Sequence, residues 1–360
     1  MDFYKKHKGI INIIILFLIS RIPFLYYLIK MKSISYFTIY DAIAYTSIAK
    51  NGYTPDAYYA FFPLFPLLIK LLNYIKIPYE IGGILISNIT TIISLFIVSK
   101  LIKNKSEKTK TLFYIIISPI LAYTTICYTE SLYIMLTLLA LYYYKNNKYI
   151  YSSIFTGLSI LTRNSGIILW GAIGLEMLYR LFKKKDIKLK NIILFGLIAL
   201  SIGMIYPVFL YIKTNDFLMF STVQGKYWNK ENGYVIFTLI ADIKFLINHF
   251  RISQLYIFIQ NWLFFILGIV IAIKNRKKDM ASAIYIVVSL IAFTLVYRDP
   301  NYWNNLPSLS LMRYILSLFP IYLYLPNISN KNKINNILLI LISIISFINI
   351  FIVYSNGFIA

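Results

Sequence analysis

Long runs of apolar residues constrain this chain more than any other feature of its sequence. Many approach or reach the roughly 20 residues that an α-helix needs to cross a bilayer. Eleven such runs are spread along the chain: 10–29, 81–102, 112–127, 131–144, 149–161, 167–182, 192–212, 255–273, 281–297, 309–325 and 334–354. The mean hydropathy is +0.70 and only 14% of the residues are charged, which excludes a soluble or disordered protein. The sequence therefore predicts an all-α polytopic membrane protein with about eleven transmembrane helices.

Three consecutive runs, between residues 112 and 161, are shorter than a membrane crossing requires. Such segments are tolerated at membrane depth when other parts of the protein enclose them. We expect these three to be tilted, broken or buried inside the protein. The first run, 10–29, follows a basic segment and is long enough for a retained signal anchor.

Basic residues mark one side of the membrane when the spans alternate. With a cytoplasmic amino terminus, 22 of the 36 Lys and Arg residues fall in six short cytoplasmic segments: 5–8, 100–110, 145–148, 180–190, 274–278 and 331–333. Because short cytoplasmic loops are enriched in basic residues, this pattern predicts a cytoplasmic amino terminus. The net charge of +23 thus indicates orientation. It does not indicate a nucleic-acid partner, which would need basic residues clustered on a soluble face.

The opposite side receives the two long connections, 30–80 and 213–254, and 8 of the 13 acidic residues. Polar and aromatic loops on one face of a helical bundle commonly carry function. We therefore expect one integral membrane domain over residues 1–360, with its active site on the extracytoplasmic face.

The first outer connection places Tyr40 and Asp41 at the start of an expected amphipathic helix at the membrane surface. Tyr45 lies on the apolar face of this helix, and Asn51-Gly52 is a helix stop signal. Asp41 has two interpretations. It can serve only as the N-cap, or it can be a carboxylate at the lipid boundary, where partial desolvation makes it a better base for a hydroxyl proton.

Two further motifs follow on the outer side. Segment 60–70 contains Pro63 and Pro66, so we expect it to enter the bundle as a broken helix without crossing, with a rigid interfacial turn as the alternative. Glu130 follows Thr129, a suitable N-cap residue, and a helix start accommodates a negative charge. Glu130 is therefore either a capping residue or a second carboxylate facing the same cavity as Asp41.

Two arginines are candidates for phosphate binding. Arg163 lies at an outer turn, and the segment around Asn164 that follows it offers backbone N–H groups at a helix start. Arg313 begins a late span, shortly after Asp299 and Trp303. The alternatives are an arginine that only reaches the membrane surface, for Arg163, and a pairing with an acidic residue, for Arg313.

The second long connection interleaves polar groups with aromatic rings over residues 220–228. Its Gln224 and Trp228 are of the kinds that hydrogen-bond to sugars and stack on them. An interfacial aromatic belt is the alternative.

Several kinds of chemistry have no visible site in the sequence. Cys127 is the only cysteine, the two histidines lie on opposite predicted sides, and no cluster has zinc-ligand spacing. A glycine-rich phosphate loop and a nucleophile elbow are also absent from the sequence. A divalent cation near Asp41 and Glu130 is compatible with the sequence but not indicated by it. Without a phosphate loop, the sequence shows no site for a nucleotide-activated sugar, and such sugars belong to the cytoplasm. An enzyme on the outer face would therefore need a donor that the membrane delivers, namely a lipid-linked one.

Taken in order, these motifs resemble the PIG-V type of mannosyltransferase. The matching segments are 40–42, 48–53, 60–66, 128–132, 157–166, 220–228, 312–320 and 356–358. Each motif is weak alone, and their order along most of the chain makes the set specific. Two residues depart from the family pattern: Tyr40 and Ala42 stand where the family usually has Trp and Gly.

The resemblance implies a GT-C glycosyltransferase fold, a polyprenyl- or dolichyl-phosphate sugar donor and an inverting transfer of a hexose, most commonly mannose. It implies that Asp41 is the catalytic base, with Glu130, Arg163 and Gln224 at matching family positions. The acceptor would be a lipid-linked sugar or a glycan. In this interpretation Arg313 is a second phosphate ligand. The residues that contact sugar or lipid are Tyr40, Tyr45, Asn164 and Trp228.

Two other classes of protein compete with this interpretation. A transporter or lipid-glycan flippase would carry ionisable residues at the membrane midplane and inverted repeats. Most predicted spans are free of charge at their middles, and no repeat is evident. A glycan polymerase or ligase is the closer competitor, because such enzymes also use arginines in outer loops.

Overall fold

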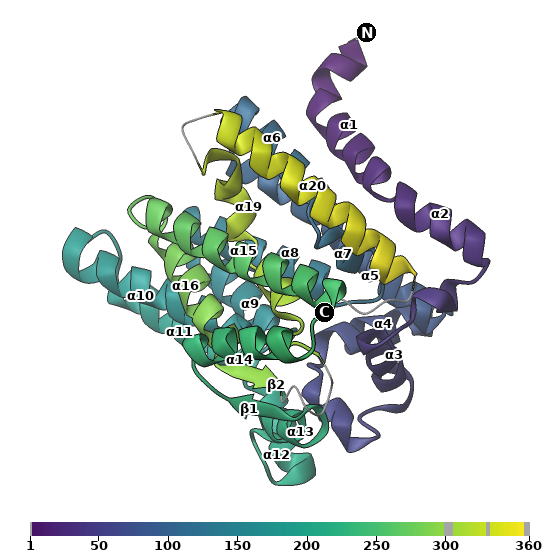
Figure 1. Ribbon diagram of the computed structural model, residues 1–360. Helices are drawn as coiled ribbons and strands as arrows, with labels where there is room; N and C mark the ends of the chain where they lie inside the picture. Colours follow the sequence, from purple (N-terminus) through teal and green to yellow (C-terminus); the bar gives the residue numbers. More distant parts are fainter. Residues whose placement is uncertain (1, 299–304, 329–331, 356–360) are drawn as a thin grey trace. The chain divides into compact units, whose positions relative to one another are not determined.

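The computed structural model describes residues 2–298, 305–328 and 332–355, and they are predominantly helical (Figure 1). Asp299, Trp303, Lys331 and the closing 356–358 motif lie outside the described residues. Two compact units make up the chain. The first comprises Met1–Gly52, Pro63–Asn147 and Tyr322–Phe358, and the second Tyr53–Phe62 and Lys148–Ile321. The expected single domain over 1–360 stays a prediction.

The first unit consists of apolar helices with short connections. Its elements are α1 (Asp2–Ser20), α2 (Ile22–Met31), η1 (Ile34–Phe37), α3 (Asp41–Asn51), α4 (Leu64–Tyr74), α5 (Tyr79–Leu101), α6 (Lys105–Ile116), α7 (Leu121–Thr125), α8 (Glu130–Lys145), η4 (Leu325–Asn327) and α20 (Asn332–Tyr354). The sequence boundary between the two units falls within α19 (Pro320–Tyr324).

The second unit adds a short two-stranded ribbon to its helices. Its elements are η2 (Asp56–Ala60), α9 (Tyr149–Ile160), α10 (Gly166–Tyr179), η3 (Arg180–Lys184), α11 (Leu189–Gly203), α12 (Ile205–Thr214), α13 (Met219–Trp228), β1 (Lys230–Asn232), α14 (Val235–Asn248), α15 (Ile252–Asn275), α16 (Met280–Thr294), β2 (Val296–Arg298) and α18 (Leu311–Leu316). β1 pairs antiparallel with β2. The predicted all-α class is confirmed apart from this ribbon.

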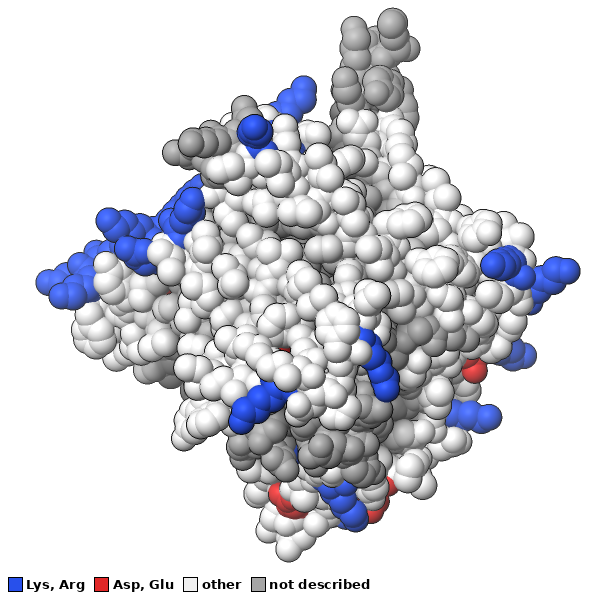
Figure 2. Space-filling model, in the orientation of Figure 1, with Lys and Arg blue, Asp and Glu red and all other residues white. Residues whose placement is uncertain are grey.

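Among the described residues, five helical segments are long and apolar enough to cross a membrane. They are Gly9–Met31, Tyr79–Leu101, Leu189–Thr214, Ile252–Asn275 and Lys333–Tyr354, and each coincides with a predicted span. The chain is thus an integral membrane protein, while the count of eleven spans stays a prediction. Much of the face in Figure 2 is uncharged, and its basic side chains form separate groups, some at the margins and some in the lower half of the view.

The remaining predicted spans are shorter or interrupted helices. The predicted span 112–127 is interrupted between α6 and α7, and 309–325 is interrupted between α18 and α19. Most side chains of α8 are buried. The expectation that the short segments between 112 and 161 are broken or buried is therefore confirmed for α7 and α8.

The first outer connection differs from its expected form in one respect. The helix expected after Asp41 is present as α3, which ends at Asn51, and Gly52 (φ +79°) follows it. The segment with two prolines is not a broken helix: α4 is continuous from Leu64 onward. Pro66 lies in its first turn, where the backbone N–H has no intrahelical acceptor, so proline costs the helix nothing there.

Glycines let α9 approach its neighbours α10 and α11 closely. A Cβ on Gly157 would lie 2.9 Å from the carbonyl oxygen of Ala199 in α11. One on Gly166 would lie 2.5 Å from the backbone nitrogen of Ile160. Small residues at such contacts allow helices in membranes to pack backbone against backbone.

We expect Gly166→Ala to lower the thermal unfolding temperature in detergent. The added methyl would meet rigid backbone, and overpacking of this kind costs about 1–3 kcal/mol. Gly171→Ala is the matched control in the same helix, because a Cβ on Gly171 would have no neighbour within 4 Å. An equal loss of stability in both variants would contradict the packing argument.

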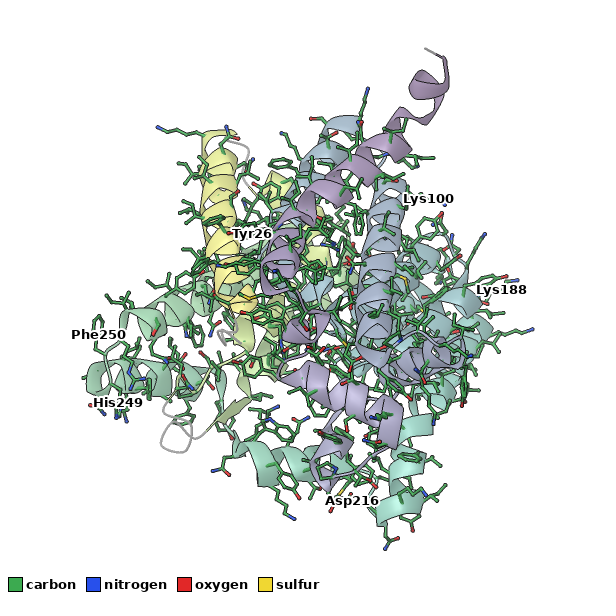
Figure 3. All side chains as sticks on the ribbon, turned by 90° about the vertical axis from the view of Figure 1, so that its right-hand side faces the viewer. Tyr26, Lys100, Lys188, Asp216, His249 and Phe250 are labelled. Carbon is green, nitrogen blue, oxygen red and sulfur yellow. The ribbon has the colours of Figure 1, made fainter. Side chains whose placement is uncertain are left out.

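Helix α14 has two different faces. Thr238, Asp242 and Phe245 are buried on one side. The other side exposes an apolar stripe at the i, i+4, i+7 and i+11 positions: Ile236, Ile240, Ile243 and Ile247. His249 and Phe250, labelled in Figure 3, lie in the turn that leads from α14 into α15. The stripe is thus continuous in sequence with the apolar crossing helix α15.

Candidate active site

The two predicted carboxylates each begin a helix of the first unit. Asp41 is the first residue of α3, and Glu130 is the first residue of α8. Asp41 is half-buried, whereas the Glu130 side chain is 1% exposed. The start of a helix carries a positive partial charge that favours a carboxylate. Both predicted acids therefore occupy positions that stabilise negative charge.

Hydrogen bonds join these two helix starts. The Tyr45 hydroxyl and Thr129 Oγ1 lie 3.3 Å apart, and the Tyr128 hydroxyl donates to the carbonyl of Ile39 at 3.4 Å. Each bond links the neighbourhood of Asp41 to that of Glu130. The structure thus joins the two helix starts that carry these carboxylates, while a shared cavity for Asp41 and Glu130 stays a prediction.

Neither of the two helix starts has the side-chain capping hydrogen bond that the sequence allows. Tyr40, and not Asp41, occupies the N-cap position of α3. Thr129 occupies the N-cap position of α8, but its side chain makes no capping hydrogen bond there. Its hydroxyl is instead directed to Tyr45.

Backbone strain lies next to the predicted base. Tyr40 has φ +51°, a region that glycine occupies readily and tyrosine rarely, and its side chain is 43% exposed. Ala42 is helical and fully buried, so the alanine found where the family has glycine requires no unusual backbone. Residues held in sparsely populated conformations cluster at functional sites, and Tyr40 fits this pattern.

Tyr45 is buried, which bears on its predicted contact with sugar or lipid. Its ring packs edge-on against Phe65, with ring centroids 5.2 Å apart. With its hydroxyl near Thr129, the side chain braces α3 against the start of α8. This geometry indicates that Tyr45 supports the site, and it does not favour direct contact between Tyr45 and a substrate.

We expect Tyr45→Phe to reduce enzymatic activity about two- to tenfold while leaving the fold intact. The variant keeps the packed ring and removes one neutral hydrogen bond, which contributes about 0.5–1.5 kcal/mol. Tyr58→Phe, a half-buried tyrosine of η2, is the control. Unfolding temperature and transfer rate measured together would reveal whether the loss reflects stability alone.

The predicted phosphate ligands come together in the second unit. The guanidinium carbon of Arg163 lies 5.1 Å from the ring centroid of Tyr314, and that of Arg313 lies 5.4 Å from the same centroid. Arg163 is half-buried and Arg313 is 6% exposed. Two guanidinium groups on one ring concentrate positive charge, a setting that favours an anionic ligand.

The backbone N–H groups after Arg163 contribute less than expected. The Gly166 N–H donates to the Arg163 carbonyl, and the Ile167 N–H donates to the Asn164 carbonyl, both at 3.0 Å. These donors therefore already have acceptors within the turn. Asn164 itself is exposed, so its side chain is accessible to a ligand.

The other two predicted contact residues lie on α13, also in the second unit. The Gln224 Oε1 accepts a hydrogen bond from the Lys230 Nζ at 2.7 Å. Trp228 is half-buried, and its ring packs edge-on against Phe61 with centroids 6.0 Å apart. The α13 surface therefore combines an amide, an ammonium group and aromatic rings.

Reasoning from the sequence missed Tyr314, Phe61 and Lys230 as parts of these clusters. Tyr314 adjoins Arg313, but a ring shared with Arg163 cannot be recognised without the tertiary structure. Within the described residues, no three His, Cys, Asp or Glu side chains are grouped so as to hold a metal ion.

The crossing helices and the paired acids at helix starts define a polytopic membrane protein with a carboxylate-bearing site. The sequence model of the mannosyltransferase (PIG-V) family matches residues 18–243, and the chain belongs to that family. The matched range includes Asp41, Glu130, Arg163 and Gln224, whereas Arg313 lies beyond it.

A similar solved structure is that of ArnT from Cupriavidus metallidurans bound to undecaprenyl phosphate. The identity is 11% and the TM-score 0.46, over 82% of this chain and 61% of ArnT. The chain thus spans about three fifths of the length of that protein. A comparison with curated protein sequences finds no match.

Proposed function

We propose that the chain is a GT-C glycosyltransferase that moves a hexose from a polyprenyl- or dolichyl-phosphate donor to an acceptor hydroxyl. Mannose is the proposed hexose. The acceptor is a lipid-linked sugar or a glycan at the extracytoplasmic face. Membership of the mannosyltransferase (PIG-V) family is the observation that carries the proposal. The joined helix starts at Asp41 and Glu130 support it independently.

In this mechanism the Asp41 carboxylate accepts the proton of the acceptor hydroxyl. The acceptor oxygen attacks the anomeric carbon of the donor sugar, and the bond from that carbon to the phosphate oxygen breaks. The electron pair leaves with the lipid phosphate, and the configuration inverts from β to α. Glu130, buried at the neighbouring helix start, shapes the charge around Asp41.

The departing phosphate gains negative charge in the transition state, and the two arginines stabilise that charge. Arg163 and Arg313 present guanidinium groups that hydrogen-bond to phosphate oxygens in pairs. Tyr40, Asn164, Gln224 and Trp228 contact sugar or lipid. Tyr45 supports the site through Thr129.

Transfer from a labelled donor tests the proposed function. Membranes containing the chain are incubated with polyprenyl-phosphate [¹⁴C]mannose and a lipid extract of the source cells, with membranes lacking the chain as control. We expect a new labelled product only when the chain is present. Transfer from a nucleotide-activated sugar, with none from the lipid phosphate, would overturn the donor assignment.

Cysteine labelling tests the orientation of the chain. Figure 3 labels Lys188 and Asp216 on either side of the Leu189–Thr214 span in sequence. In intact cells we expect a membrane-impermeant maleimide to label Lys226→Cys, beyond Asp216, but not Lys188→Cys. After lysis both should react. The parent chain is the control, because its only cysteine, Cys127, is buried; the reverse pattern would invert the proposed topology.

A further inference from the structure

The turn that leads into Arg313 is fixed by side chains from two other helices. Residues 306–312 are buried, and Arg313 follows them in α18. Ser310, within this turn, has φ +76° although it is not a glycine. A residue in this conformation is strained, and it persists when the surrounding structure over-determines it.

Asn261 of α15 holds both ends of the turn. Its Nδ2 donates to the carbonyl oxygen and to the Oγ of Ser308, both at 3.0 Å. Its Oδ1 accepts the backbone N–H of Met312 at 3.0 Å. One buried amide therefore bonds to backbone groups on either side of Ser310, and the second of these belongs to the residue before Arg313.

Asp242 of α14 holds the same turn from the neighbouring helix. Its Oδ1 accepts the backbone N–H of Ser308 at 3.0 Å, and its Oδ2 accepts the indole N–H of Trp262 at 2.8 Å. Burial raises the pKa of Asp242 to about 6, and these two donors oppose the rise. The side chain is therefore mainly a carboxylate at neutral pH, the form in which both oxygens accept.

We propose that Asp242 and Asn261 are positioning residues for Arg313. Together they set the backbone of the 308–312 turn, and that backbone sets where the guanidinium meets the lipid phosphate. The inference rests on the proposed function, because it presumes that Arg313 binds the donor phosphate. It extends the site to two residues that act on Arg313 through the backbone of the turn.

A double-mutant cycle tests the proposal, with donor kcat/KM and the unfolding temperature measured for each variant. We expect Asp242→Asn to lower kcat/KM roughly ten- to a hundredfold, because the amide nitrogen cannot accept one of the two hydrogen bonds. In an Arg313→Gln background the same substitution should cause no further loss, because the positioned group is absent.

Two further variants make the outcome decisive. Trp262→Phe removes one hydrogen-bond donor to Asp242 and leaves the carboxylate. If Asp242→Asn does not fold, Trp262→Phe replaces it in the cycle. We expect a smaller loss of kcat/KM, and no loss in the Arg313→Gln background. Asp279→Asn is the matched control: this buried carboxylate accepts the backbone N–H of Ser282 at the start of α16. It should lower the unfolding temperature and leave kcat/KM unchanged.

The possible failures are distinguishable. Losses that add in the Arg313→Gln background, or equal losses in the Asp279→Asn control, would overturn the positioning role and leave the proposed function intact. Full activity of Arg313→Gln alone would instead remove the phosphate role on which the inference depends.

Discussion

Asp41→Asn is expected to abolish most sugar transfer while the protein is still made and folded. A positioned general base contributes about 10²–10⁴-fold to a rate, so kcat should fall by that factor. Asparagine keeps the size and polarity of the side chain at the start of α3, so the helix should be retained. Initial rates of transfer from the labelled lipid phosphate, normalised to folded protein, are the measurement.

Asp56→Asn provides the matched control for this experiment. Asp56 is an exposed acid in the same outer connection and begins η2. We expect this variant to retain full activity. If Asp41→Asn were as active as the parent chain at normal expression, Asp41 could not be the base.

Arg313→Gln is expected to lower kcat by about 10²–10³-fold, the usual effect of removing one group that stabilises developing negative charge. Arg313→Lys should fall between the parent and the glutamine variant. Lysine keeps the charge but loses the planar pair of donors that matches a phosphate. The donor dependence of the rate gives kcat and KM separately.

Arg180→Gln is the control for loss of an arginine. Arg180 pairs with the exposed Asp186 at 3.1 Å in the segment predicted to be cytoplasmic. We expect its loss to leave kcat unchanged. A loss of activity in Arg313→Gln matched by a lower unfolding temperature, with Arg313→Lys equally impaired, would point to a structural role instead.

Local patterns in the sequence predict much of the fold. The helix expected after Asp41 is present as α3, and the Asn51-Gly52 signal marks its end. Pro63 and Pro66 lead to the wrong prediction of a broken helix at α4. The sequence alone does not show whether Pro66 lies in the first turn or in the interior of a helix. That distinction depends on where the preceding chain turns, which is a tertiary property.

The candidate site is predictable by residue but not by geometry. Acids and arginines at outer turns are visible in the sequence, whereas Asn261 is not among the residues predicted from it. Their partners are distant in the chain: Arg163 shares a ring with Tyr314, and Asp242 binds the backbone at Ser308. Such contacts arise from helix packing, for which no local pattern exists.

The two faces of α14 have a practical consequence for any assay of this enzyme. The helix that carries Asp242 inward exposes Ile236, Ile240, Ile243 and Ile247 on its other side. An apolar stripe of this kind is covered by hydrocarbon, so the solvent of α14 is the lipid or detergent that surrounds the protein. We therefore expect the chain length of the detergent to change the transfer rate, because α14 connects this surface to the turn before Arg313, the proposed phosphate ligand.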